Sequence, residues 1–113
     1  MRKIKFYRLP SGSSPVKDFL DSLPGKEAQK LVWVLRFIEE QERVPRTFFK
    51  KLVSTDDIWE VISKFGSIRI LGFCQQRWLI LTNGFFKKSQ KTPPKEINIA
   101  QERKKNYHQA TKL

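Results

Sequence analysis

The first part of the chain passes from an alternating pattern of apolar and polar residues to a helical spacing. Residues 2–9 alternate and predict a short strand. Ser14 is a good N-cap, Pro15 suits a first helical position, and Leu23-Pro24-Gly25 ends a helix, so we expect a helix between them. Its buried positions would be Val16, Phe19, Leu20 and Leu23.

A second helix is predicted from about Lys26 to Glu42, with core positions at Ala28, Leu31, Leu35 and Ile38. Trp33 and Phe37, four residues apart, lie on a different face of this helix. A helix that is apolar on two faces is either packed between other elements or in contact with a partner. The second face would therefore pack against the first helix or bind another protein.

The second half of the chain has the pattern of strands. Three β-branched and aromatic segments, separated by Phe65-Gly66 and Gln75-Gln76, predict a three-stranded antiparallel meander over residues 57–65, 67–74 and 77–85. Phe48–Val53 would be a further short strand or a bridge into the meander. Pro93-Pro94 ends the last strand, and a closing helix is expected from Pro94 to about His108.

Helices that are separated from a mainly antiparallel sheet form an α+β arrangement, and 113 residues suit a single domain over residues 1–113. The chain has no signal-peptide pattern and no apolar stretch long enough to span a bilayer, so we expect a cytoplasmic protein with no membrane partner. One Cys and one His allow neither an intramolecular disulfide nor a zinc-type ligand cluster. No metal or cofactor is expected.

The charge of the chain indicates that this α+β domain binds a partner. The formal net charge is +12, of which residues 61–113 carry +9 and residues 1–60 carry +3. A surplus of this size predicts a polyanionic partner, nucleic acid before anionic membrane.

The positive charge is densest in the segment NGFFKKSQKTPPKEI, residues 83–97. Lys87, Lys88 and Lys91 follow a predicted strand, and such ammonium groups bind phosphates through counterion release. Phe85 and Phe86 offer rings on which a base could stack. The alternative is a solvated loop beside core phenylalanines. The further RNA contacts that we expect are Lys50, Lys51, Arg77, Phe85, Lys95 and Arg103.

Glu60 and Arg69 form the second candidate feature. If Phe65-Gly66 is a two-residue turn, Ile62 pairs with Arg69 and Glu60 with Leu71, so that Glu60 and Arg69 lie diagonally on one face. The pair would be a structural salt bridge, or a carboxylate that holds an arginine for a phosphate.

The familiar hydrolytic motifs, such as a nucleophile elbow or a Gly-rich phosphate loop, do not occur in the sequence. RNA carries its own nucleophile, the 2′-hydroxyl, so its cleavage requires in-line geometry, charge neutralisation and modest proton transfer. Lysines and arginines supply most of this. Glu60 is a candidate base and Tyr107 a secondary candidate for proton transfer, although Tyr107 also suits the core.

Three segments, IWEVI at 58–62, IRILGF at 68–73 and the run from Leu79 to Tyr107, closely resemble the HigB-like, phage-type branch of the RelE/ParE toxin superfamily. The resemblance implies a small RelE-like fold and a toxin of a type II toxin–antitoxin module, which enters the ribosomal A site and cleaves mRNA there. The matching residues are Trp59, Glu60, Arg69, Gly84, Phe85, Lys87, Lys88, Lys91, Pro93, Ala100, Arg103 and Tyr107.

The resemblance also implies that Arg69, Lys87, Lys88 and Lys91 contact the scissile phosphate and its neighbours, and that a helix-turn-helix antitoxin silences the toxin. Members often carry His where this chain has Asn83, and a basic residue where it has Ile62. Two other functions agree with the sequence: a ParE-like toxin that inhibits DNA gyrase without cleaving RNA, and a non-catalytic RNA-binding protein. We expect the antitoxin to use Trp33 and Phe37 as an apolar contact.

Overall fold

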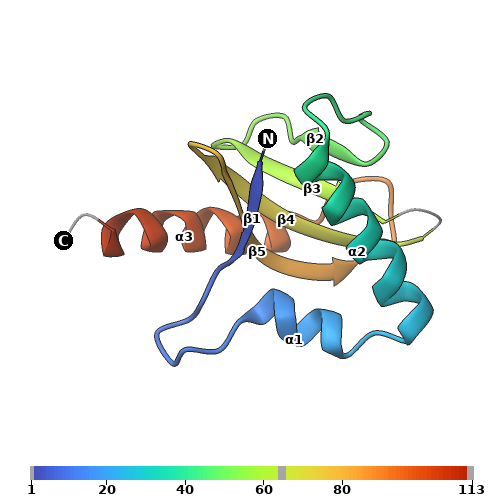
Figure 1. The fold of residues 1–113 in the computed structure, drawn as a ribbon. Coiled ribbons are helices and arrows are strands. Elements are labelled where there is room, and N and C mark those ends of the chain that lie inside the picture. Colours follow the sequence, from blue (N-terminus) through green and yellow to red (C-terminus); the bar gives the residue numbers. More distant parts are fainter. Residues whose placement is uncertain (1, 64–65, 112–113) are drawn as a thin grey trace.

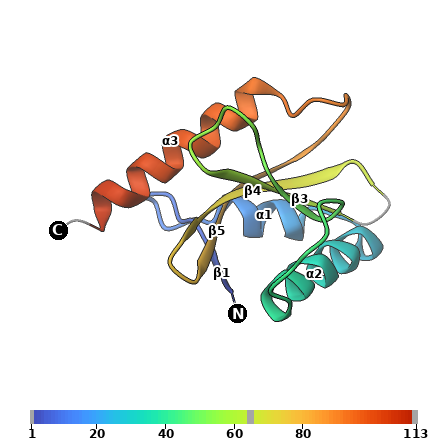
Figure 2. The same cartoon turned by 90° about the horizontal axis from the view of Figure 1, so that it is seen from above.

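One five-stranded sheet lies between two layers of helices in the computed structural model, which describes residues 2–63 and 66–111. The elements in chain order are β1 (Lys3–Phe6), α1 (Pro15–Asp21), α2 (Gly25–Glu40), β2 (Phe49–Lys51), β3 (Ile58–Ile62), β4 (Ile68–Gln75), β5 (Trp78–Phe86) and α3 (Pro94–Ala110). The helices α1 and α2 cover one face of the sheet and α3 covers the other (Figures 1 and 2). The predicted α+β class is confirmed.

The strand order is β1-β5-β4-β3-β2. The pairs β2–β3, β3–β4 and β4–β5 are antiparallel, and β1 adds to β5 in parallel. The predicted meander is therefore confirmed, and the segment Phe48–Val53 contains the short strand β2. The second connection is Gln76-Arg77 and not Gln75-Gln76, because β4 continues through Gln75. The first connection includes Phe65, which lies outside the described residues.

Each face of the sheet has its own core. Toward α1 and α2, side chains of the outer helices pack on β4 and β5, as Leu31 and Ile38 do with Ile70 and other residues. Toward α3, Phe73 and Ile80 pack with Ala100. Successive side chains of a strand point to opposite faces, so each inner strand contributes residues to both cores. A charged residue in an inner strand therefore lies on a face that is covered by helices.

The helix starts follow the predicted punctuation, whereas the helix ends differ by about two residues, and α1 ends at Asp21, before the predicted Leu23-Pro24-Gly25. Ser14 caps α1, since its Oγ accepts a hydrogen bond of 3.4 Å from the backbone N–H of Lys17. The helix α2 ends at Glu40, two residues before the predicted end, and α3 continues to Ala110, two residues beyond it.

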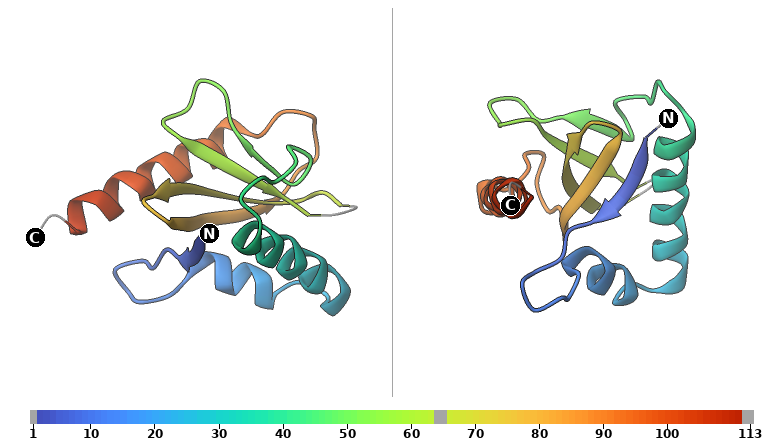
Figure 3. Two further views of the ribbon diagram at one scale, coloured as in Figure 1. Left: turned by 45° about the horizontal axis from the view of Figure 1, so that its top comes forward. Right: turned by 60° about the vertical axis from the view of Figure 1, so that its left-hand side comes forward.

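The second apolar face of α2 packs differently from the prediction. The helices α1 and α2 meet at a corner and do not lie side by side (Figure 3). The ring of Trp33 stacks on Phe37 at 5.4 Å between centroids, and both rings meet Phe48 edge-on at 5.8 and 5.9 Å. Phe48 precedes β2, so the expected packing of this face on α1 was wrong. The residues before β2 cover this face in part.

Candidate nucleic-acid interface

A buried carboxylate lies at the centre of the basic cluster. The register of β3 and β4 pairs Ile62 with Arg69 and Glu60 with Leu71, as the sequence predicted. Oε1 of Glu60 lies 3.3 Å from Nε of Arg69 and 3.4 Å from Nζ of Lys87. The predicted diagonal contact of Glu60 with Arg69 is thus present, and Lys87 from the end of β5 joins it.

The Glu60 carboxylate is fully covered, while 16% of the Arg69 side chain and 8% of the Lys87 side chain are exposed. A buried carboxylate is tolerated only when charges and hydrogen bonds compensate it. Two cations share one anion here, so the cluster keeps an excess positive charge. The surface of the cluster is therefore positive, because only the two cations are partly exposed to solvent.

The guanidinium of Arg69 is held from two sides. Its Nη1 donates to the backbone carbonyls of Gly66 at 2.7 Å and Ile68 at 2.9 Å. Its Nε faces Glu60 without the alignment of a hydrogen bond, so that contact is an ion pair and not a directional bond. These contacts hold the guanidinium in one place before any ligand arrives.

The loop from Lys87 to Pro93 is attached at both ends. The backbone N–H of Lys87 donates to the carbonyl of Ser67 at 2.6 Å, and the hydroxyl of Thr92 donates to Oε2 of Glu60. Thr92 had no place in the sequence predictions. A hydroxyl residue next to two prolines was the only available signal, and it does not reveal a partner 32 residues away.

A shallow hollow of about 510 Å³ opens beside this cluster and is lined by Arg69, Lys87, Lys88, Ser89 and Gln90. Lys88 and Lys91 are exposed on the loop, and Lys95 is exposed in the first turn of α3. The structure therefore brings the predicted residues Arg69, Lys87 and Lys88 to one surface. An anion that entered the hollow would meet two anchored cations and one mobile one.

The two lysines of β2 lie on opposite faces of the sheet. Lys50 pairs with Glu60 across the strands and lies on the same face of the sheet, next to the cluster. Lys51 pairs with Trp59 on the other face, and its Nζ lies 3.8 Å from Asp57. Of the two predicted RNA contacts, only Lys50 lies on the face of the sheet that carries Glu60, and neither lysine lines the hollow.

The two phenylalanines of the basic segment also lie on opposite faces of the sheet. Phe85 is 7% exposed and packs in the core under α3, so its predicted role in stacking on a base does not agree with the structure. Phe86 is 52% exposed and contacts Phe19 edge-on, with 5.5 Å between the ring centroids. Successive residues of a strand point to opposite faces, so only one of the two rings could be on the surface.

Arg103 and Asn83 attach α3 to the sheet. Nη1 of Arg103 donates to the carbonyl of Thr82 at 2.6 Å. The amide of buried Asn83 donates to the carbonyl and the carboxylate of Glu96 at 3.2 and 3.0 Å, and its oxygen accepts from the Thr82 hydroxyl at 2.7 Å. Arg103 was predicted to contact RNA, but this guanidinium is already engaged inside the fold.

Tyr107 and Arg77 lie at the other end of the sheet. The ring of Tyr107 contacts Phe73 edge-on at 5.5 Å, and Phe73 is four residues, or roughly 13 Å, from Arg69 along β4. Arg77 lies in the turn between β4 and β5, also away from the hollow. The structure does not bring Tyr107 to Arg69 and Lys87.

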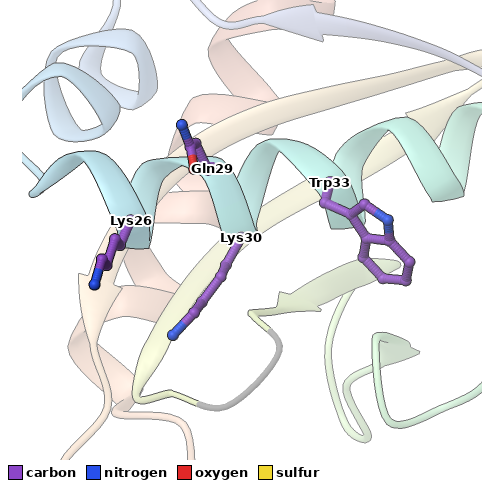
Figure 4. A pocket seen from close by; sticks show the side chains of 4 residues that line it. All are labelled: Lys26, Gln29, Lys30 and Trp33. Carbon is purple, nitrogen blue, oxygen red and sulfur yellow. The ribbon is translucent and has the colours of Figure 1, made fainter.

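Trp33 lies on the outer surface of α2 and is 48% exposed. Figure 4 shows that Lys26, Lys30 and Trp33 project from one side of this helix. Together with Gln29 they line a hollow of about 320 Å³. This surface is separate from the cluster around Glu60, which lies under the opposite face of the sheet.

The profile of the phage-derived protein Gp49-like family (DUF891) matches residues 18–105. The chain belongs to this family. The family comprises RelE/ParE-like toxins of toxin–antitoxin modules, so membership implies an antitoxin partner. No curated protein matches the sequence.

Neither a metal-binding cluster nor a membrane-spanning helix occurs in the part of the chain that the structure describes. Residues 2–63 and 66–111 contain no group of three or more His, Cys, Asp or Glu side chains placed to hold a metal ion. Within the same ranges no helix has the length and apolar character that a bilayer crossing requires.

Proposed function

We propose that this Gp49-like toxin is an endoribonuclease that cleaves mRNA on the ribosome. The observation that carries the proposal is the buried Glu60 carboxylate, which holds Arg69 and Lys87 within 3.4 Å at the base of an open basic hollow. Cations that are fixed before the ligand arrives require no reorganisation as charge develops in a transition state. The matching sequence segments of the HigB-like branch agree with this assignment.

In the proposed reaction the 2′-hydroxyl oxygen attacks the adjacent phosphorus and the bond to the 5′-oxygen breaks. The products are a 2′,3′-cyclic phosphate and a 5′-hydroxyl end. The 2′-hydroxyl loses a proton and the leaving 5′-oxygen gains one. Between these stages the phosphorane carries an additional negative charge, and Arg69, Lys87, Lys88 and Lys91 would neutralise it.

Glu60 acts in this proposal as a positioning residue. Its carboxylate is covered and is occupied by two cations and the Thr92 hydroxyl, so the 2′-hydroxyl has no path to it. Tyr107, a secondary candidate for proton transfer from the sequence, lies at the far end of the sheet and has no part in the mechanism proposed here. Asn83 is an amide bonded to Glu96 and supplies no acid or base.

Primer extension on mRNA bound to programmed ribosomes, with purified protein, tests the proposal. The informative variant is Lys88→Ala/Lys91→Ala, because both side chains are exposed and neither takes part in the salt bridges of the described residues. We expect the parent to cut within codons and this variant to cut at least about tenfold more slowly, since each lost cation weakens phosphate binding.

The matched control is Lys17→Ala/Lys26→Ala, which removes the same charge from exposed positions on α1 and α2. It should cut at the parental rate. If the parent leaves ribosome-bound mRNA intact, or if the loop variant cuts as fast as the control, the proposal is wrong. Intact mRNA with steep, salt-dependent RNA binding would favour the non-catalytic alternative, and DNA damage after induction would favour gyrase inhibition.

We also propose that the antitoxin contacts the outer surface of α2 through Trp33 and its neighbour Phe37. The exposed indole is flanked by Lys26, Lys30 and Arg36. A surface of this kind suits an acidic, amphipathic segment with an apolar residue that covers the ring. Binding there would leave the hollow beside Arg69 open, so inhibition would require the antitoxin to extend around the sheet or to exclude the ribosome.

A further inference from the structure

A second basic surface lies at the end of the sheet opposite to Glu60. Nζ of Lys5 lies 5.7 Å from the centre of the Trp78 ring and 5.4 Å from that of the Tyr107 ring, and it donates to the Tyr107 hydroxyl at 3.3 Å. Nζ of Lys3 lies 5.9 Å from the centre of the same Trp78 ring. Two ammonium groups from one strand thus share one indole.

These cations form no ion pair with the described residues, although the Glu39 carboxylate lies nearby and accepts a hydrogen bond of 3.2 Å from the backbone N–H of Ile4. None of the salt bridges among the described residues involves Lys3, Lys5 or Arg8. All three side chains are exposed, and the two lysine ammonium groups contact aromatic rings and the Tyr107 hydroxyl. Arg77, in the adjacent turn, adds a further charge.

The surface is hollowed as well as charged. A cavity of about 680 Å³ opens between β1, the residues that follow it and the last turns of α3. Its lining includes Lys5, Arg8, Asn106 and Tyr107. The indole of Trp78 is not part of this lining, but it is 39% exposed and lies beneath the ammonium group of Lys5, which does line the cavity. Cations, a polar amide and exposed ring surface are therefore present in one concave region.

We propose that this region is a second RNA contact, which binds a nucleotide of single-stranded RNA with its phosphate at Lys3 and Lys5 and its base on Trp78 or Tyr107. A phosphate draws the two ammonium groups off the rings, because a full negative charge attracts them more strongly than a ring quadrupole does. The ring surface that they leave is then open to a base. The choice of RNA as the ligand rests on the proposed function.

The second contact is separate from the first. Trp78 and Phe86 are the two ends of β5, which are eight residues apart and hence separated by roughly 26 Å. A dinucleotide cannot reach from one contact to the other, whereas a longer strand can. The consequence is a toxin that holds RNA at a distance from the proposed cleavage site as well as within it.

Tryptophan fluorescence during titration with the dinucleotide UpU tests this contact without ribosomes and without cleavage. We expect saturable quenching in the parent and in Lys88→Ala/Lys91→Ala, and loss of that quenching in Trp78→Phe. Trp33→Phe is the matched control, since Trp33 is also exposed but lies on α2, and it should retain the quenching. Lys3→Ala/Lys5→Ala should weaken binding about tenfold. It should also reduce the slope of log binding constant against log salt concentration by about 0.7, because one phosphate is no longer neutralised.

Three results would overturn the proposal: saturable quenching that survives Trp78→Phe, quenching that disappears in the loop variant, or displacement of UpU by short polyglutamate at equal charge concentration. The last result would assign the surface to an acidic protein segment. Thermal unfolding of each variant separates lost binding from lost folding. Because the assay does not depend on cleavage, a parent that fails to cut mRNA but shows Trp78-dependent quenching refutes only the proposed endoribonuclease activity.

Discussion

Nζ of Lys87 lies 3.4 Å from Oε1 of Glu60, and almost none of either side chain is exposed to solvent. The contact joins the end of β5 to the middle of β3, across the intervening β4 that carries Arg69. A single carboxylate of β3 thus contacts Arg69 of β4, Lys87 directly after β5 and, in the loop before α3, Thr92. The charges that we propose for phosphate binding are at the same time part of the interior of the protein.

The first prediction concerns this carboxylate. Glu60→Gln retains the side-chain volume but leaves Arg69 and Lys87 buried without an anion. Removal of one partner from a buried charge cluster costs about 3 kcal/mol or more, and we expect a loss of that size in the free energy of unfolding by urea.

Asp57→Asn is the matched control for Glu60→Gln. Asp57 pairs with Lys51 at 3.8 Å, and 54% of the lysine side chain and 38% of the aspartate side chain are exposed. Exposed pairs contribute less than about 1 kcal/mol. Equal losses in the two variants would mean that Glu60 is not the stabilising centre that its burial indicates.

The second prediction concerns Gly84, the glycine of the Gly-Phe-Phe motif. A Cβ added at Gly84 would lie 2.4 Å from Cδ2 of Phe19, whose ring packs on this position of β5. Gly84→Ala should lower the free energy of unfolding by about 2 kcal/mol, as overpacking does. In a double-mutant cycle with Phe19→Leu, which removes the obstructing ring, the two losses should be clearly less than additive. Additive losses would show that the Phe19 ring is not the cause.

The third prediction concerns Cys74 and pH. Burial, followed by the nearby Asp57 carboxylate, raises the pKa of the Cys74 thiol above its usual value of 9.0. The native state therefore keeps a proton that the unfolded chain loses, so stability is complete below about pH 9 and falls as pH rises through the folded pKa. The difference in unfolding free energy between the parent and Cys74→Ala should decrease above that pH. A constant difference would contradict the raised pKa.

The fourth prediction tests the antitoxin contact. If Trp33 is covered in the complex, Trp33→Ala weakens binding of the cognate antitoxin at least about tenfold, as loss of a central aromatic does. Val53→Ala is the control, because Val53 is 87% exposed and lies outside α2. Isothermal titration with purified antitoxin measures both. Equal affinities for parent and Trp33→Ala would place the contact elsewhere.

The sequence predicted the local structure better than it predicted contacts between distant segments. Alternation and turn residues were enough to pair Glu60 with Leu71, because a register in a covered sheet is set by which face each residue must occupy. The same rule predicts that one of Phe85 and Phe86 is buried and the other exposed. Which of the two is buried can be stated only when it is known which face α3 covers. The contact of Thr92 with Glu60 depends on how the loop returns over the sheet, and no periodicity in the sequence records that path.

The last prediction separates binding from folding at two basic residues: Lys88, which was predicted to contact the scissile phosphate or its neighbours, and Arg103, which was predicted to contact RNA. Arg103→Ala removes the donor to the carbonyl of buried Thr82, so it should cost about 1–3 kcal/mol of unfolding free energy while leaving the salt slope of RNA binding unchanged. Lys88→Ala should do the reverse: stability within about 0.5 kcal/mol of the parent, and a slope lower by about 0.7 for single-stranded RNA. Urea unfolding and RNA titrations at several salt concentrations measure both quantities on the same preparations. A lower slope for Arg103→Ala would mean that this guanidinium leaves Thr82 to meet a phosphate, and an unchanged slope for Lys88→Ala would remove this lysine from the interface.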